Sequence, residues 1–158
     1  MDSGIEIREA RVEDAPAACQ VLRRSITELC VADHGNDRAI LTRWLDNKTP
    51  DIVASWVSQP AGSMLLAVEQ ERILAVGSVI DAGTVILNDV SPDARFRGVS
   101  GALLSALEAR AVERGSTKFT LISTETARRC YRANGYVELG PRNRRDPGVG
   151  LPDGQVVA

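Results

Sequence analysis

The sequence predicts an α+β fold in which a mixed β-sheet is flanked by helices. Three consecutive runs rich in Val, Ile and Leu are separated by turns of hairpin length, which makes neighbouring strands antiparallel. These runs are Met64 to Glu69, Ile73 to Ile80 and Thr84 to Val90. An amphipathic helix then connects the third run to a strand at Lys118 to Ser123, and a crossover of this kind makes the two connected strands parallel.

Composition and charge limit the class of protein. The chain has 158 residues, with 44% hydrophobic side chains, 25% charged side chains and a net charge of −2. These values are typical of a globular protein, and the length favours a single domain over residues 1–158. No polybasic run indicates a nucleic acid partner, and no apolar window is long enough to span a membrane.

The N-terminus and the cysteines indicate a cellular compartment. The first ten residues carry charges and no apolar run, so we expect no signal peptide. The three cysteines, Cys19, Cys30 and Cys130, are widely spaced and lack a CxxC pair. This spacing predicts neither a disulfide framework nor a metal site. We therefore expect a cytoplasmic protein without a bound metal.

The N-terminal third of the chain predicts one strand followed by three helices. Ile5 to Ile7 alternates with charged residues as a short strand does, and a first helix begins near Asp14 and reaches Cys30. The stretch Ala32 to Asn36 is expected to be a loop. Two further helices are predicted, the second of which begins at Thr49-Pro50, where a cap residue precedes a proline at the first helical position.

The C-terminal part predicts a helix from Thr126 to Ala133 and a strand from Tyr136 to Leu139. Residues 140–158 are rich in Pro, Gly and Arg, and only Gln155 to Ala158 could form a weak last strand. A stunted last strand would leave a sheet edge open. A partner subunit could cover this edge, so a homodimer is one alternative and a frayed edge is the other.

The segment from Gly83 to Gly115 carries the main functional signal. Arg95 and Arg97 precede a helix whose N-terminus already presents a partial positive charge and unpaired N–H groups. Cations repel such an end unless an anion binds there, and a strand-to-helix turn with small residues suits a phosphate group. The alternative is a solvated basic turn whose charge is compensated by Asp93.

Two sequence blocks resemble a known family. Arg95-Phe96-Arg97-Gly98-Val99-Ser100 resembles the (Q/R)-x-x-G-x-(G/A) signature of the GNAT (GCN5-related) N-acetyltransferases. The segment Ala127 to Tyr136 is similar to the A-x-x-x-Y-x-x-x-G-(F/Y) block of the same family. The order of strands also matches, so the resemblance covers Ile5 to Leu139. It implies the GNAT acyl-CoA N-acyltransferase fold, with acetyl-CoA as the acyl donor.

The resemblance implies cofactor-binding roles for the strand before the helix, for the arginine-containing turn, for the start of the helix and for two later positions. These residues are Val90, Ser91, Arg95, Phe96, Arg97, Gly98, Val99, Ser100, Gly101, Thr124 and Tyr131. The turn would cradle the pyrophosphate, the strand end would pair with the pantetheine arm, and an amide near Val90 would polarise the acetyl carbonyl. Ser100 and Thr124 depart from the family, which usually has Gly or Ala at the first position and often Asn at the second.

The implied reaction is the direct attack of a primary amine on the thioester, with a small molecule or a peptide as the acceptor. In the family's motif, Tyr131 matches the position of the general acid. A phenol can protonate a departing thiolate, since the two have comparable basicity. A tyrosine of the core is the alternative reading of this residue. The general base is Asp89, Glu69, His34 or an ordered water. The family also implies that the loop from Cys30 to Asp37 shapes the acceptor pocket.

Two other functions stay open. The first is a non-catalytic acyl-CoA-binding regulatory module, which would bind acetyl-CoA without transferring its acetyl group. The second is a different nucleotide-binding α/β domain, since a strand-glycine-helix turn also binds dinucleotides. The second is disfavoured, because the turn lacks the full dinucleotide fingerprint and the strands before it are linked by hairpins instead of helices.

Overall fold

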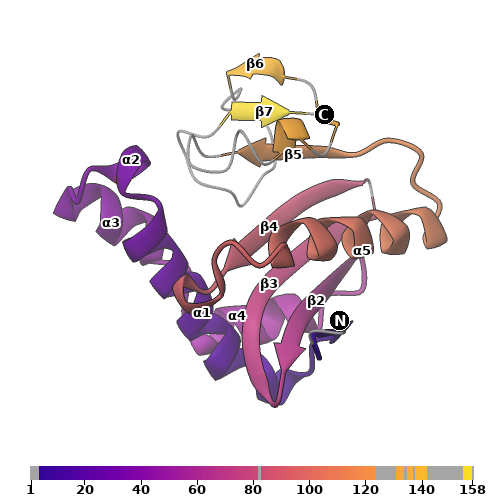
Figure 1. Ribbon diagram of the computed structural model, residues 1–158, viewed down its shortest axis with the longest axis horizontal. Coiled ribbons are helices and arrows are strands. Elements are labelled where there is room, and N and C mark those ends of the chain that lie inside the picture. Colours follow the sequence, from indigo (N-terminus) through magenta and orange to yellow (C-terminus); the bar gives the residue numbers. More distant parts are fainter. Residues whose placement is uncertain are drawn as a thin grey trace.

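The described residues form seven strands in one mixed sheet. The computed structural model describes residues 4–81, 83–123, 131–133, 135–136, 138–141 and 155–157. The strand order is β1-β2-β3-β4-β5-β7-β6 (Figure 1). The strands are β1 Glu6–Glu9, β2 Gly62–Glu69, β3 Arg72–Ile80, β4 Thr84–Val90, β5 Thr120–Ser123, β6 Glu138–Pro141 and β7 Gln155–Val157.

The pairing of the strands confirms the predicted mixed sheet. Each of the strands β1 to β3 pairs antiparallel with the strand that follows it in the sequence, and β4 pairs parallel with β5. The β2–β3 hairpin turns at Gln70 and Glu71, whose φ angles are 49° and 70°. A two-residue loop with two positive φ angles matches the right-handed twist of the strands that it connects. The antiparallel strands β2 to β4 therefore form a continuous platform.

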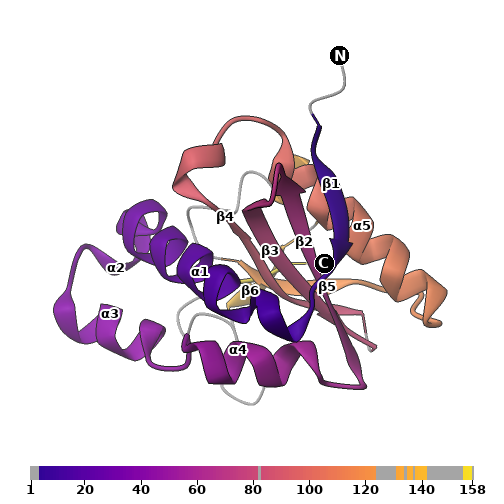
Figure 2. The ribbon, with the colours of Figure 1, turned by 90° about the horizontal axis from the view of Figure 1, so that it is seen from below.

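Helices cover both faces of this platform (Figure 2). Figure 2 shows α1 and α4 on one side of strands β2 to β4 and α5 on the other. On the α5 face, Leu103 and Leu107 are fully buried against the sheet, whereas Leu22 and Val53 fill the opposite face. The helices are α1 Ala15–Leu29, α2 Val31–His34, α3 Arg38–Leu45, α4 Pro50–Val57 and α5 Val99–Glu113, with 3-10 turns η1 Val12–Asp14 and η2 Pro92–Ala94.

Local capping explains where two of these helices begin. The Thr49 hydroxyl accepts a hydrogen bond from the Ile52 N–H at 3.3 Å, and Pro50 occupies the first helical position of α4. The Asp37 carboxylate accepts from the Ile40 N–H at 3.1 Å at the start of α3. Each cap pairs a backbone donor that the helix itself leaves without a partner. The prediction of a helix start at Thr49-Pro50 is confirmed.

The segment expected to be a loop contains a short helix. Helix α2 covers Val31–His34 and ends at Gly35, whose φ is +58°. The His34 ring makes two hydrogen bonds, a buried one to the Ile26 carbonyl and a partly buried one from the Asn36 N–H. This anchoring of a single turn to the end of α1 depends on tertiary contacts, which periodicity in the sequence does not reveal.

The C-terminal region completes the sheet in a different order from that of the sequence. Strand β7 lies between β5 and β6 and pairs antiparallel with both. The weak last strand is thus present, and β6 is the edge of the sheet. Of the predicted helix at 126–133, residues 131–133 are helical and residues 126–130 lie outside the described part. Within the part of the chain that the structure describes, no helix is long and apolar enough to cross a membrane.

Candidate active site

Strands β4 and β5 touch only where they begin. Thr84 pairs with Thr120 and Val85 with Leu121, and the two threonine hydroxyls are 3.1 Å apart. Beyond this point β5 pairs with β7, while β4 continues beside β3 alone. The register of β4 against β3 shifts at Ile86, and a bulge of this kind bends a strand. Residues 86–90 of β4 therefore have a free edge toward the described part of β5.

Gly83 fixes the point from which the two strands diverge. Its φ is +86°, and a Cβ atom here would lie 2.0 Å from the Lys118 carbonyl oxygen. The Thr120 N–H donates to the Gly83 carbonyl at 3.1 Å. Only glycine permits both this φ and this close approach of two backbones. The contact holds the start of β5 against β4 and leaves the strands to part afterwards.

Two backbone N–H groups of β4 point to the free edge. Ser91 N–H donates to the Leu74 carbonyl at 2.7 Å, and Ala75 is paired with Val90 in the register of β3 and β4. Successive residues of an antiparallel strand direct their N–H and C=O groups to opposite edges. Val90 and, two residues before it, Asn88 therefore direct these groups away from β3, toward β5.

Ser91 closes the turn after β4. Besides the bond of its N–H to Leu74, its hydroxyl accepts from the Asp93 N–H at 3.2 Å and its carbonyl accepts from the Ala94 N–H at 2.9 Å. Ser91 was expected to pair with the cofactor together with Val90. Because its backbone donor is already bonded, only Val90 of this pair has main-chain groups directed to the free edge.

The turn before α5 has the shape of an anion-binding nest. Phe96 and Gly98 have φ angles of +63° and +73°, and Arg97 between them does not have a positive φ. Such alternation turns successive N–H groups toward one side. At the start of α5, the Ala102 N–H donates to the Gly98 carbonyl at 3.1 Å, four residues earlier. Residues 95–98 are exposed, with Phe96 at 93%.

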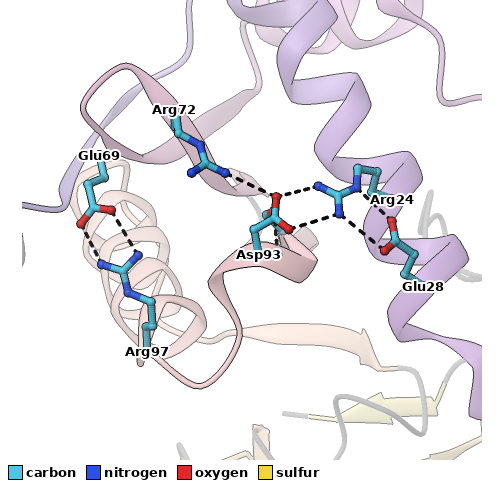
Figure 3. Close-up of polar contacts among 7 residues, drawn as sticks. Arg24, Glu28, Glu69, Arg72, Asp93 and Arg97 are labelled. Atoms are coloured by element: carbon cyan, nitrogen blue, oxygen red, sulfur yellow. Dashed lines mark hydrogen bonds and ion pairs between the residues drawn. The ribbon is translucent and has the colours of Figure 1, made fainter.

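The charges around this turn differ from the predicted arrangement. Arg97 makes a two-pronged ion pair with Glu69 of β2, with N···O distances of 2.7 Å and 3.2 Å (Figure 3). The Arg95 guanidinium lies 4.7 Å from the centre of the Phe96 ring. Asp93, which compensates these arginines in the alternative of a solvated basic turn, binds Arg24 and Arg72. Figure 3 shows Asp93 linking the turn to α1, where Arg24 also binds Glu28.

Tyr131 lies on the α5 face of the sheet. Its side chain is 6% exposed and belongs to the apolar cluster that α5 forms with the sheet, against which Val90 also packs. The Tyr136 ring meets it edge to face, with centroids 5.9 Å apart. The Tyr136 hydroxyl in turn donates to Glu108 of α5 at 2.7 Å. Tyr131 is therefore held within the core on the same face as Val90.

Asp89 lies on the opposite face of the same strand. Its carboxylate is hydrogen-bonded to Ser25 of α1, and the neighbouring Leu87 packs with α1 and α4. Burial raises the pKa of Asp89 to about 6, although the positive charge of Lys48 and the bond to Ser25 both lower it. The residue nevertheless keeps part of its surface accessible. A carboxyl group with such a pKa is suited to accept a proton near neutral pH.

Lys48 is a buried cation beside this acid. It is 4% exposed, and its ammonium group donates to Asn47 Oδ1 at 2.6 Å and lies 5.8 Å from the centre of the Trp56 ring. Its carbonyl accepts from the Cys19 thiol at 3.1 Å and from Arg23 Nη1 at 2.9 Å. Burial lowers the pKa of Lys48, and the charge of Asp89 opposes this effect. The segment that carries Lys48 is thus fixed to α1.

Two of the three side chains considered as general base do not suit that role. The backbone N–H of Asn36 must donate to His34 Nδ1, so Nε2 carries the proton and donates to the Ile26 carbonyl at 2.8 Å. No ring lone pair remains to accept a proton. Glu69 is bound to Arg97 beside the turn, and these hydrogen bonds lower the pKa of its carboxyl group. Asp89 is the remaining protein candidate.

Of the other predicted site residues, Val99 is buried and Ser100 and Gly101 are partly buried at the start of α5, whereas Thr124 lies outside the described residues. Cys19 and Cys30 are buried free thiols, and burial together with the nearby charges of Asp89 and Asp33 raises the pKa of Cys30 to about 12. No cluster of metal-ligating side chains occurs in the described ranges. Sequence reasoning missed Ser25 and Lys48; the only signal was that Lys48 is one of two lysines in the chain.

Comparisons with known proteins identify a family and a set of similar folds. The sequence profile of the GNAT acetyltransferase domain matches residues 31–150. A GCN5-related N-acetyltransferase from Rhodopseudomonas palustris has a similar structure, with a TM-score of 0.83 and 22% identity over 99% of this chain and 96% of that one. No curated protein sequence matches the chain.

Two similar structures contain coenzyme A or acetyl-CoA. The PaiA N-acetyltransferase from Thermoplasma acidophilum, in complex with coenzyme A, gives a TM-score of 0.79 at 15% identity, over 99% of this chain and 98% of that one. YncA, a putative acetyltransferase from Salmonella typhimurium with acetyl-CoA, gives 0.69 at 19% identity, over 98% and 91%. At these identities the likeness shows the fold, and the profile match covers most of the chain. The chain therefore belongs to the GNAT acetyltransferase family.

Proposed function

We propose that this protein transfers an acetyl group from acetyl-CoA to a primary amine of a small molecule or a peptide, by direct attack of the amine on the thioester. The observation that carries the proposal is the free edge of β4, where the N–H groups of Asn88 and Val90 point away from β3. These donors lie in β4, and the turn and the N-terminus of α5 follow β4 in the chain. Together they match an extended ligand with an anionic end.

The anionic end of the donor would bind at the turn before α5, and the rest of the donor would lie along β4. The N–H groups of the turn and of the first residues of α5, with Arg95 and Arg97, would hold the pyrophosphate. The pantetheine arm would then extend along β4 toward Asn88, pairing first with Val90. One of the two outward N–H groups would stabilise negative charge on the thioester oxygen. The coenzyme A and acetyl-CoA in the PaiA and YncA structures support this choice of donor.

The two proton transfers would take place on opposite faces of β4. The amine nitrogen attacks the thioester carbon and forms the amide bond, the C–S bond breaks, and the thiolate leaves. Asp89, on the α1 face, would accept the proton that the amine loses, either directly or through a water. Tyr131, on the α5 face, would give a proton to the departing thiolate. The acceptor would therefore approach from the side of α1.

A non-catalytic acyl-CoA-binding regulatory module is the second candidate. The 6% exposure of Tyr131 and its packing in the core favour it, because a tyrosine can be buried for stability alone. A homodimer and a cytoplasmic location stay predictions from the sequence, which does not identify the amine.

The first test separates donor binding from turnover. Acetyl-CoA should raise the melting temperature, because a ligand that binds only the folded protein stabilises it, whereas NAD and ATP should not. Coenzyme A thiol should then be released in the presence of an accepted amine from a panel of small amines and peptides. Failure of acetyl-CoA to stabilise the protein would refute the proposal. Stabilisation without thiol release across the whole panel would favour the regulatory module.

Tyr131→Phe tests the general acid. The substitution keeps the ring and its contact with Tyr136 but removes the proton donor. Thiol release should slow by about 100-fold or more, as expected for the loss of general acid catalysis, while the Kd for acetyl-CoA stays nearly the same. Tyr136→Phe is the matched control, since it removes a hydroxyl that is bonded to Glu108 on the same face. Equal rates for the Tyr131 variant and the unmodified protein would assign Tyr131 to the core alone.

The pH dependence of the rate tests Asp89 and its neighbour Lys48. A base must be deprotonated to act, so the rate should fall as the pH drops through about 6, the pKa of Asp89. Asp89→Asn should remove this acidic limb and lower the rate. Lys48→Met removes a positive charge that lowers the pKa of Asp89, so the limb should move to higher pH. Lys118→Met, which changes the only other lysine and an exposed one, should leave it in place. A profile that is the same in all variants would exclude Asp89 as the base.

A further inference from the structure

The side chain of Asn88 is an unpaired amide inside the protein. Its Nδ2 and Oδ1 atoms are both buried, and neither has a hydrogen-bond partner within the described part of the chain. Buried polar groups are nearly always paired, because an unpaired one loses its bonds to water without replacement. An apolar side chain of similar size would therefore suit a purely structural role at this position better.

The register of β3 and β4 shows which face the Asn88 amide occupies. Asn88 is directly opposite Gly77 in β3, and side chains that are opposite in an antiparallel pair lie on the same face. A Cβ atom at Gly77 would lie 2.7 Å from Leu107 Cδ1 and 3.0 Å from a methyl group of Leu103, both in α5. Asn88 therefore lies on the α5 face, and these apolar neighbours offer no hydrogen bond.

This position lies along the path that the donor would take. Val90 and Asn88 share the α5 face and are separated by two residues of strand, which is about 7 Å. A ligand that is anchored by its anionic end at the start of α5 and extended along β4 passes Val90 before it reaches Asn88. Near its thioester end, the acyl-pantetheine arm carries an amide and a thioester carbonyl. A carboxamide has both a donor and an acceptor for such groups.

We propose that the Asn88 carboxamide hydrogen-bonds to the acyl-pantetheine arm of the donor and so contributes to donor affinity. The proposal rests on the donor binding described under "Proposed function". It makes Asn88 a ligand-binding residue through its side chain, in addition to the backbone N–H at the free edge of β4. The two effects of the side chain have opposite signs: it weakens the free protein and strengthens the complex.

Substitution of Asn88 separates these two effects. Asn88→Leu replaces the unpaired amide by an apolar side chain of similar shape, so the free protein should melt at a higher temperature. The Kd for the donor should rise about tenfold, because the hydrogen bond to the ligand is lost. Asn88→Ala also removes the amide and adds no volume, so it should show the same loss of affinity. This variant controls for a steric clash between the leucine side chain and the ligand. The Kd values are measured by calorimetric titration with acetyl-CoA and with coenzyme A.

Trp44→Phe is the matched control. Trp44 Nε1 is also buried without a partner in the described residues, but Trp44 packs with Ile26 and Cys30, in a cluster separate from that of α5. Removing this polar group should not weaken the binding of either ligand. The comparison thus distinguishes the loss of an unpaired buried group in general from the loss of a ligand contact.

Comparing the Kd values for acetyl-CoA and coenzyme A shows which group of the donor Asn88 contacts. If Asn88 bonds to the pantetheine amide, both acetyl-CoA and coenzyme A bind more weakly to the Asn88 variants; if it bonds to the acyl carbonyl, only acetyl-CoA does. Either result supports the proposal. Unchanged Kd values for both ligands in both variants would overturn it, even if the unmodified protein binds them. Absence of binding to the unmodified protein would instead refute the proposed function itself.

Discussion

The candidate site depends on one constraint, the short parallel contact between β4 and β5. Gly83 lets the two backbones meet, since a side chain there would overlap the Lys118 carbonyl, and the bulge at Ile86 bends β4 beyond the contact. If the strands stayed paired, β5 would bond to the outward N–H groups of Asn88 and Val90. Because the strands part, the middle of the sheet gains two aligned backbone donors that point away from β3.

The alternation of side chains along β4 then assigns different chemistry to the two faces of the sheet. Asn88 and Val90 lie on the α5 face with Tyr131, in line with the turn that begins α5. Asp89, between them, lies on the α1 face beside Ser25 and the buried Lys48. The proposed donor and the proposed acceptor thus meet one strand from opposite sides.

Much of the fold could be predicted because its signals are local. Hairpin-length turns gave the order of β2 to β4, and the amphipathic helix after Val90 gave the parallel pairing of β5. The parts that sequence reasoning missed are non-local: β7 inserts between β5 and β6, and Arg97 forms an ion pair with Glu69 of β2. The Asp89 environment was missed for the same reason, since Ser25 and Lys48 come from separate segments. The unpaired Asn88 amide becomes visible only when the register places it against α5.

The most direct test of this account is the hydrogen exchange rate of individual backbone amides of β4, measured by NMR with and without coenzyme A. The Asn88 and Val90 N–H groups should exchange quickly in the free protein and become protected when coenzyme A is added. The Ser91 N–H, which is bonded to the Leu74 carbonyl, should be protected in both states and serves as the internal reference. Asn88 and Val90 amides that exchange at the same rate with and without saturating coenzyme A would contradict the claim that the free edge of β4 binds the donor.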